Sequence, residues 1–495
     1  MLILLSSSVP TYLFLIGAVL PMPDRFEILH KDLAARIGRL STPHGTIETP
    51  GLMPVVNPHL HLIPPKELKE MGADIIITNS YIIHEDARLK AQALEKGLHD
   101  LIGFQGPIMT DSGAFQLSVY GSVEVLPLEI LEFQFAIHSD ICVPLDIPTP
   151  PDVSRERAQS ELQETEKRLV EAAAQERPAL LAGPIQGSTY PDLREKAAAF
   201  LRDKSFDVCP VGGVVPLMEA YRFRDLVSVV TAAKKGLGSG APVHLFGAGH
   251  PMVFALAAAM GCDLFDSAAY AIFARQGRYL TVQGTWKLDE MNYLPCSCPV
   301  CQSHTQKELM QSPEKIKLLA RHNLYVSLAE MKLVKQCIWE GSLWELLESR
   351  CRSHPRMLDG YMKLCTESEW LEGLDTASKS TMFYLSPQSA SRPEAVRYSR
   401  RIDRITLEGA VLITDDREAD TTGFDHVLHF KPPFGPYPPE LAETYPFNAE
   451  VPEITDEAAQ KRAAENIQRL MKANPKASFS FRLKCQMEGI DGGGR

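Results

Sequence analysis

Pro107-Ile-Met-Thr-Asp111-Ser-Gly-Ala-Phe-Gln116 is a short apolar run that ends abruptly in an acid, a hydroxyl and a glycine. This pattern is typical of a buried strand that delivers polar groups to an exposed rim, where Gly113 lets the backbone approach a ligand. Two further acids have the same setting, Asp146 after Val143-Pro-Leu and Asp266 after Cys262-Asp-Leu-Phe. A single acid of this kind is more often a helix cap, but three of them indicate a shared pocket.

Apolar runs of strand length recur on both sides of this stretch, and segments of helical pattern lie between several of them. The runs occupy residues 73–78, 107–110, 141–145, 179–185, 206–211, 242–246 and 262–265. A (β/α)8 barrel and a doubly wound sheet both contain this alternation. Polar groups follow nearly every run, which is how a barrel assembles an active site from its strand ends. We therefore predict an α/β protein built on a (β/α)8 TIM barrel, preceded by an antiparallel hairpin at residues 26–51.

The composition limits the classes of protein that remain. With 495 residues, of which 45% are hydrophobic, the chain can bury a large core spread over more than one domain. The net charge of −11 repels phosphate, so a nucleic-acid partner requires a local basic patch. The ten cysteines cluster only at Cys296, Cys298 and Cys301, which indicates a reduced, intracellular protein without a disulfide framework.

These three thiols, within six residues, have the spacing of metal ligands. Thiolates suit tetrahedral zinc, and a Cys3His set leaves no open position, so the metal would be structural. His304 is the nearer candidate for the fourth ligand. His322 is more distant but lies in a helical segment that could pack back over the loop.

The chain divides into three parts by composition. Residues 1–21 are uncharged and apolar, and we expect a mis-assigned start or a disordered leader, with Met22 the initiator, in preference to a membrane anchor. Residues 22–365 hold the barrel and the zinc site, and residues 366–495 form a small α/β domain. In that domain we expect parallel strands at 410–414 and 426–430, a helix at 455–473 and a proline-rich rigid loop at 431–439. A Ser/Thr/Pro-rich linker at 378–393 is expected to lead into it.

Several motifs occur in the order of one family. They are Asp111-Ser-Gly-Ala-Phe-Gln116, Gln186-Gly-Ser-Thr-Tyr-Pro-Asp192, Gly212-Gly213, Phe265-Asp266-Ser267 and the Cys-x-Cys-x-x-Cys…His set. This order closely resembles the tRNA-guanine transglycosylases over about residues 25–365. Gly213-Val-Val-Pro-Leu217 and Phe246-Gly-Ala-Gly-His-Pro251 are similar to the archaeal branch. Ala114 departs from the pattern, because many relatives have a second glycine there.

The resemblance implies a cytoplasmic, homodimeric pentosyltransferase with a zinc-bearing barrel. Such an enzyme exchanges guanine at position 15 of the tRNA D-arm for 7-cyano-7-deazaguanine (preQ0), by double displacement at ribose C1′, on the way to archaeosine. The family's spacing selects Cys296, Cys298, Cys301 and His322 as the ligands of one structural Zn²⁺. Archaeal relatives often continue into a PUA module. None is recognised in this sequence, so we expect a separate PUA-domain protein to help in holding tRNA.

Retention at C1′ requires two inversions and hence a covalent glycosyl–enzyme intermediate. By resemblance Asp266 is the nucleophile and Asp111 the general acid/base, although the sequence leaves the reverse assignment open. Asp146 suits a guanine-like base, because a carboxylate can accept both N1–H and the 2-amino group. The remaining base-binding candidates are Gln186 and the Gly213 N–H as donors to O6, Gly212 beside them, Ser112 as a further contact and Phe115 as a stacking ring.

Two other functions compete with this one. A non-catalytic tRNA-binding accessory subunit would be expected to lose one of the paired acids, and all three acids are present here. An unrelated barrel hydrolase would require a metal with an open position, which a Cys3His set does not offer. For the tRNA surface we predict two basic groups, one at Lys307, Lys315, Lys317, Arg321, Lys332 and Lys335, the other at residues 397–404.

Overall fold

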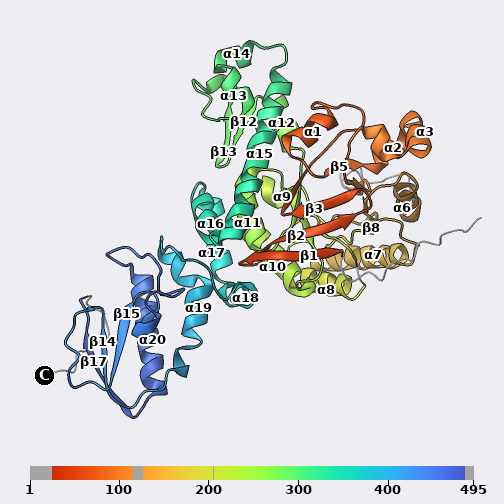
Figure 1. Cartoon of the computed structure of the whole chain (residues 1–495). Helices are drawn as coiled ribbons and strands as arrows, with labels where there is room; N and C mark the ends of the chain where they lie inside the picture. The colour runs from red at the N-terminus through yellow and green to blue at the C-terminus, as the bar shows by residue number, and fades with distance from the viewer. Residues whose placement is uncertain (1–24, 115–125, 205, 485–495) are drawn as a thin grey trace, which may run out of the picture.

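The computed structural model describes residues 25–114, 126–204 and 206–484 (Figure 1). The expectations for residues 1–21 and for Phe115 lie outside these ranges. No helix in the described ranges has both the length and the apolar character that crossing a bilayer requires.

Within the described residues, eight parallel strands form a closed ring. They are β4 (Gly51–Pro54), β5 (Ile76–Asn79), β6 (Ile108–Asp111), β7 (Ile141–Cys142), β8 (Leu180–Leu181), β9 (Cys209–Val211), β10 (Val243–Leu245) and β11 (Leu264–Ser267). They pair as two four-stranded sheets, β5-β6-β7-β8 and β4-β11-β10-β9. Parallel bridges from Val55 to Ile77 and from Ala182 to Val208 join the two sheets at both edges. The ring confirms the predicted barrel and excludes the doubly wound sheet.

The sequence pattern located seven of these strands and missed β4. Its four residues follow the N-terminal antiparallel sheet directly, so the pattern gave no separate signal. That sheet has three strands, β1 (Phe26–Asp32), β2 (Ala35–Thr42) and β3 (Gly45–Thr49), and confirms the expected hairpin region. Leu40 and Ile47 from this sheet join the apolar cluster inside the barrel, so the sheet closes one end of the barrel.

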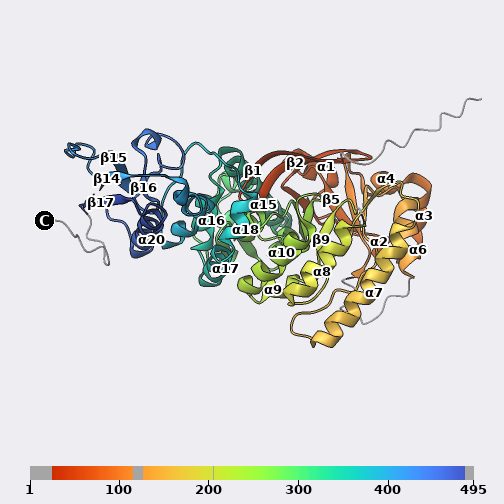
Figure 2. The same ribbon diagram turned by 90° about the horizontal axis from the view of Figure 1, so that it is seen from below.

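Helices cover the outside of the ring (Figure 2). The helix expected at residues 152–176 is α7 (Arg155–Ala173), and it begins where the Ser154 side chain accepts the backbone N–H of Arg157. The others are α1 (Pro65–Met71), α2 (Ser80–Glu85), α3 (Ala87–Lys96), α4 (Leu98–Ile102), α6 (Pro127–Ala136), α8 (Pro191–Arg202), α9 (Val215–Glu219), α10 (Phe223–Leu237) and α11 (Phe254–Ala259).

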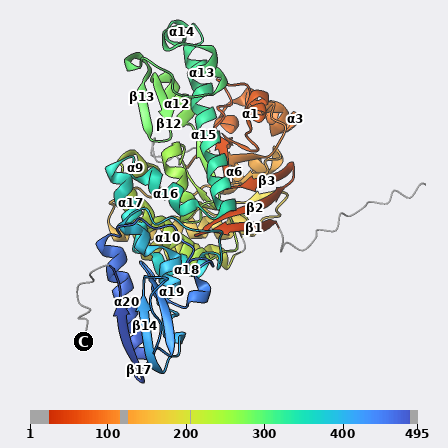
Figure 3. The ribbon, with the colours of Figure 1, turned by 60° about the vertical axis from the view of Figure 1, so that its left-hand side comes forward.

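After β11 the chain leaves the barrel and builds a small lobe on it (Figure 3). The lobe consists of α12 (Ala269–Arg275), the hairpin β12 (Arg278–Thr281) and β13 (Gly284–Lys287), α13 (Pro299–Ser303) and α14 (Gln306–Gln311). The long helix α15 (Lys315–Glu340) then runs back to the barrel, where it packs against β1, β2 and β4. Three further helices follow, α16 (Leu343–Cys351), α17 (Pro355–Cys365) and α18 (Ser368–Leu374).

The C-terminal region has its own sheet. β14 (Gly409–Thr414) pairs in parallel with β15 (His426–Lys431), as expected, and with β17 (Ala477–Arg482). α19 (Pro393–Ser399) precedes this sheet and α20 (Glu457–Ala473) packs beside it. The expectation of a plain loop at residues 431–439 is wrong, because β16 (Gly435–Tyr437) lies there and pairs antiparallel with β15.

The stretch at residues 378–393 is not a free linker. The Lys379 Nζ lies 2.7 Å from Asp32 Oδ1 at the end of β1, and 3.1 Å from both Asp375 Oδ1 and Glu394 Oε1. All four side chains are buried. A single ammonium therefore ties β1 to the segment that leads into the C-terminal sheet.

Candidate active site and metal centre

The three predicted acids meet at the C-terminal end of the barrel. Asp111 is the last residue of β6, Asp146 follows β7, and Asp266 belongs to β11. The charges of Asp146 and Asp266 both act on the Asp111 carboxyl. The three acids that follow apolar runs in the sequence therefore lie in one site.

Asp111 has the most perturbed carboxyl of the three. Burial, followed by the charges of Asp146 and Asp266, raises its pKa to about 7, against the opposing effect of backbone N–H groups of Ser112 and Gly113. The Asn79 Nδ2 donates to Asp111 Oδ2 at 3.2 Å. A carboxyl with this pKa can hold or release a proton near neutral pH.

Asp266 is held differently. His244 Nε2 lies 2.9 Å from Asp266 Oδ1, and the backbone N–H of Gly247 donates to the same oxygen at 2.7 Å. No described residue donates a hydrogen bond to Oδ2. One oxygen of Asp266 is thus fixed while the other is available to an incoming atom.

Asp146 is buried and paired with Gln186, which follows β8. Gln186 Nε2 donates to Asp146 Oδ2 at 2.6 Å. Burial raises the pKa of Asp146 to about 6, and the Gln186 hydrogen bond opposes that rise. This bond uses one of the two N–H groups of the Gln186 amide, and the other is left for the expected contact with a base.

Two glycines after β9 leave the space for this pair. A Cβ on Gly212 would stand 2.2 Å from Gln186 Nε2, and one on Gly213 would stand 2.7 Å from the Thr149 carbonyl oxygen. Gly213 also has φ +67°, in the region that favours glycine. Ser112 is buried, and its hydroxyl donates to the Pro144 carbonyl at 3.3 Å.

Sequence reasoning missed two buried residues of this site. His244, in β10, orients Asp266, and Arg194, in α8, donates to the carbonyls of Ile185, Ser188 and Gly212 at 2.6–2.8 Å. Both are fully buried. For His244 the only signal in the sequence was a basic side chain within an apolar run; α8 carries several other charged residues, so Arg194 gave no signal of its own.

The second predicted site is also assembled. Cys296, Cys298, Cys301 and His322 offer one ligand atom each, all within 4.8 Å of one another, and this set could hold a metal ion. His322 Nδ1 lies 3.3 Å from Cys301 Sγ and 3.5 Å from Cys298 Sγ. His322 Nε2 lies 3.0 Å from the Leu280 carbonyl oxygen, which fixes the proton there and leaves the Nδ1 lone pair toward the thiols.

The alternative ligand His304 is not part of this set. Its Nδ1 lies 3.0 Å from the Val300 carbonyl oxygen, within α13 and its C-terminal end. His322 instead comes from α15, and the Tyr279 ring stacks on it at 3.6 Å between centroids. The choice of His322 over His304 agrees with this arrangement.

Comparison with known proteins identifies clear relatives. A family model described as queuine tRNA-ribosyltransferase matches residues 32–356. A Methanosarcina barkeri protein named tRNA-guanine(15) transglycosylase is 59% identical, over 92% of this chain and 93% of the relative. Proteins with the same name from Haloarcula marismortui and Pyrococcus furiosus are 54% and 48% identical. These matches cover 94% and 70% of the respective relatives, and 92% and 86% of this chain.

Proposed function

The chain belongs to the queuine tRNA-ribosyltransferase family, and from this membership we propose that it is a tRNA-guanine(15) transglycosylase. It is a pentosyltransferase that replaces guanine 15 in the tRNA D-arm with preQ0, a step toward archaeosine. The observation that carries the proposal is the meeting of Asp111, Asp146 and Asp266 in one site. Two carboxyls with different surroundings can divide the nucleophile and acid/base roles of a retaining exchange.

In the first step the Asp266 carboxylate attacks ribose C1′ as the C1′–N9 bond breaks, forming a covalent glycosyl–enzyme. His244 and Gly247 hold Oδ1, so Oδ2 is the attacking atom. The departing guanine takes the proton of Asp111, whose pKa of about 7 lets it carry one near neutral pH.

In the second step preQ0 gives its N9 proton to the Asp111 carboxylate, and N9 attacks C1′ and releases Asp266. Two inversions return the original configuration. Trapping the denaturation-resistant tRNA adduct and mapping it by mass spectrometry tests the assignment. We expect the adduct on the peptide that contains Asp266. An adduct on Asp111 would show that Asp111 is the nucleophile and Asp266 the general acid/base.

Recognition of the base rests on Asp146. Its carboxylate accepts N1–H and the 2-amino group of guanine or preQ0, and Gln186 supports it from behind through the 2.6 Å bond. We expect the Gly213 N–H and the Gln186 amide to donate to O6, with Gly212 and Ser112 beside them; Phe115, the expected stacking ring, lies outside the described residues. Adenine lacks both donors that Asp146 reads, so it is rejected.

The Cys3His set holds one structural Zn²⁺ per chain. Three thiolates and one imidazole close the tetrahedral coordination sphere that zinc prefers, and the Leu280 carbonyl orients the imidazole. We expect His322→Ala to lose the metal and to destabilise the lobe around α13–α15, as measured by metal analysis and thermal unfolding. His304→Ala is the matched control and should keep one zinc; the opposite pattern contradicts the ligand set.

For tRNA we propose a cytoplasmic homodimer assisted by a separate PUA-domain protein. The basic surface includes three lysines of the lobe and α15, namely Lys307, Lys315 and Lys332. Lys317, Arg321 and Lys335 contribute less, because they pair with Glu314, Glu67 and Glu48. Likewise Arg397 and Arg400 pair with Glu372, so the group at residues 397–404 is a weaker candidate than its sequence indicates.

Incorporation of radiolabelled guanine into tRNA tests the function. We expect weak exchange by the chain alone, with a PUA-domain protein raising tRNA affinity and leaving the KM for the free base unchanged. A transcript with adenine at position 15 is the control and should take up no label. Full-strength exchange by the chain alone would refute the need for a PUA partner. Label in the control transcript would refute position 15 as the site of exchange.

A further inference from the structure

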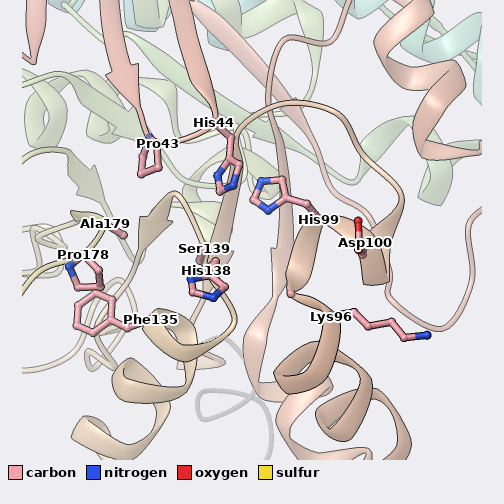
Figure 4. Close-up of a pocket in the computed structure, with 11 residues that line it drawn as sticks. Pro43, His44, Lys96, His99, Asp100, Phe135, His138, Ser139, Pro178 and Ala179 are labelled. Atoms are coloured by element: carbon pink, nitrogen blue, oxygen red, sulfur yellow. The ribbon is translucent and has the colours of Figure 1, made fainter. Parts of the chain in front are cut away.

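A second group of ligand-type side chains lies at the opposite, N-terminal end of the barrel. A cavity of about 320 Å³ opens there between the β2–β3 turn, α4 and the residues just before β7 and β8. Its lining includes His44, His99 and His138, and Figure 4 shows the rings of His44 and His99 next to each other. Three of the fourteen histidines of the chain thus gather at one surface cavity.

Two of these histidines contact Asp140, a fully buried residue. Its Oδ1 accepts the backbone N–H of His44 at 2.8 Å and lies 3.0 Å from His44 Nδ1. Its Oδ2 accepts the backbone N–H of Ile108 at 2.8 Å and lies 3.0 Å from His99 Nε2. Each oxygen therefore has one backbone donor, and each turns its remaining lone pair toward an imidazole nitrogen.

The three side chains are close enough to share one ion. A ligand atom of each lies within 4.8 Å of those of the other two, and the two imidazole centroids are 3.7 Å apart. We propose that His44, His99 and Asp140 form a second site for a divalent transition-metal ion of the Zn²⁺ type, separate from the Cys3His set. Two imidazoles and one carboxylate form a donor set that such ions accept.

The surroundings suit this role. The backbone N–H groups of His44 and Ile108 fix the carboxylate, as hydrogen-bonded partners commonly do for ligating carboxylates. Without an ion, the ring nitrogens of His44 and His99 that face Asp140 lie at hydrogen-bond distance from it. A bound ion would replace the proton between each nitrogen and the carboxylate, and each imidazole would keep one proton on its other ring nitrogen. The ion would tie the β2–β3 turn to α4 and to the start of β7, and its open positions would face water in the cavity.

Accessibility separates this site from the Cys3His set. The side chain of His44 is 41% exposed and that of His99 is 16% exposed, whereas His322 is fully buried. An ion at the second site can therefore exchange with solvent while the ion of the Cys3His set is retained. A titration of protein that already holds one zinc per chain would report on the second site alone.

The test is isothermal titration of that one-zinc protein with zinc chloride at pH 7.5. We expect one additional ion per chain, bound at least about tenfold more weakly in His44→Gln and in His99→Gln. His304→Gln is the matched control and should bind the additional ion as the unaltered protein does. The two histidine variants alter different elements, the β2–β3 turn and α4, so a fold defect in one leaves the other as a test.

Cobalt distinguishes the location of the added ion. With zinc retained in the Cys3His set, Co²⁺ at the second site should give weak visible bands without the intense near-ultraviolet charge transfer of thiolate ligands. A stoichiometry that stays at one ion per chain would overturn the proposal. So would an additional ion that folded His44→Gln and His99→Gln both retain, or a thiolate signature on the added cobalt.

Discussion

Asp263 directly precedes β11 and Asp266 lies three residues later, near the C-terminal end of the strand, and their surroundings are opposite. At the N-terminal end, Arg36 Nε and Nη2 donate to the two oxygens of Asp263 at 2.8 and 2.9 Å, and the Val243 N–H donates at 2.7 Å. At the C-terminal end, Asp266 has both its donors on one oxygen and no lysine or arginine paired with it among the described residues.

Asp140 and Asp111 repeat this contrast on neighbouring strands. Burial raises the pKa of Asp140, but hydrogen bonds from His99, Ile108 and His44 outweigh it and hold the pKa below its usual value. Burial and two neighbouring acids raise the pKa of Asp111 to about 7. At Asp140 the hydrogen bonds outweigh burial and the acid ties neighbouring segments together, whereas at Asp111 burial and the neighbouring acids outweigh the hydrogen bonds and the acid can exchange a proton.

The largest effect is expected at the reactive end. Asp266→Asn removes the nucleophile and should lower the rate of base exchange roughly 10⁴- to 10⁶-fold, as loss of a catalytic nucleophile does. Asp111→Asn should lower it about 10²- to 10⁴-fold, the range for a general acid/base. Guanine incorporation measures the rates, and denaturant unfolding should show that both variants stay folded. If a variant unfolded instead, the acid that it lacks would be needed for stability, as we expect of Asp263.

At the N-terminal end of the barrel, substitution of an acid should lower the free energy of unfolding. Asp263→Asn leaves the buried Arg36 without its counter-charge and should cost about 3–5 kcal/mol of unfolding free energy. Denaturant titration measures this, and Asp203→Asn, in an exposed pair with Arg202, should change stability by less than about 1 kcal/mol. Equal losses in the two variants would show that the Arg36 pair is no stronger than a surface pair.

A smaller effect is expected in the pH dependence of stability. Because the folded pKa of Asp111 is raised to about 7, the folded state binds the proton more tightly than the unfolded state does. Asp111 therefore costs stability progressively as the pH rises from its ordinary pKa toward 7. Unfolding midpoints of Asp111→Asn and the unaltered protein should differ more at pH 8 than at pH 5, with the variant the more stable. A difference that does not change with pH would contradict the raised pKa.

Much of the barrel was readable from the sequence, because strands buried on both faces appear as short apolar runs. Acids after such runs marked the reactive end, and the thiol spacing marked the metal centre. β4 was missed because it is only four residues long and follows β3 directly. The hairpin, the seven other strands and α7 were predicted near their observed positions.

The residues that hydrogen-bond to the site could not be predicted from the sequence in the same way. His244 bonds Asp266 across 22 positions of sequence, and Arg194 bonds Gly212 across 18, so neither forms a local motif. Asp263 and Asp266 occur in one apolar run, and nothing in the run tells which faces an arginine from β2. Only closure of the ring brings these groups together, and only then does each acid acquire its chemistry.

The contact of Lys379 with Asp32 sets a condition on the order of synthesis. Asp32 leaves the ribosome hundreds of residues before the lysine that neutralises it, and a nascent chain that ends near residue 365 already contains every barrel strand. Until Lys379 is made, Asp32 must stay hydrated or protonated, because a buried carboxylate without a cation is costly. We therefore expect burial of the ionised Asp32 at the end of β1 to be completed only late in translation, although β1 is the first described element made.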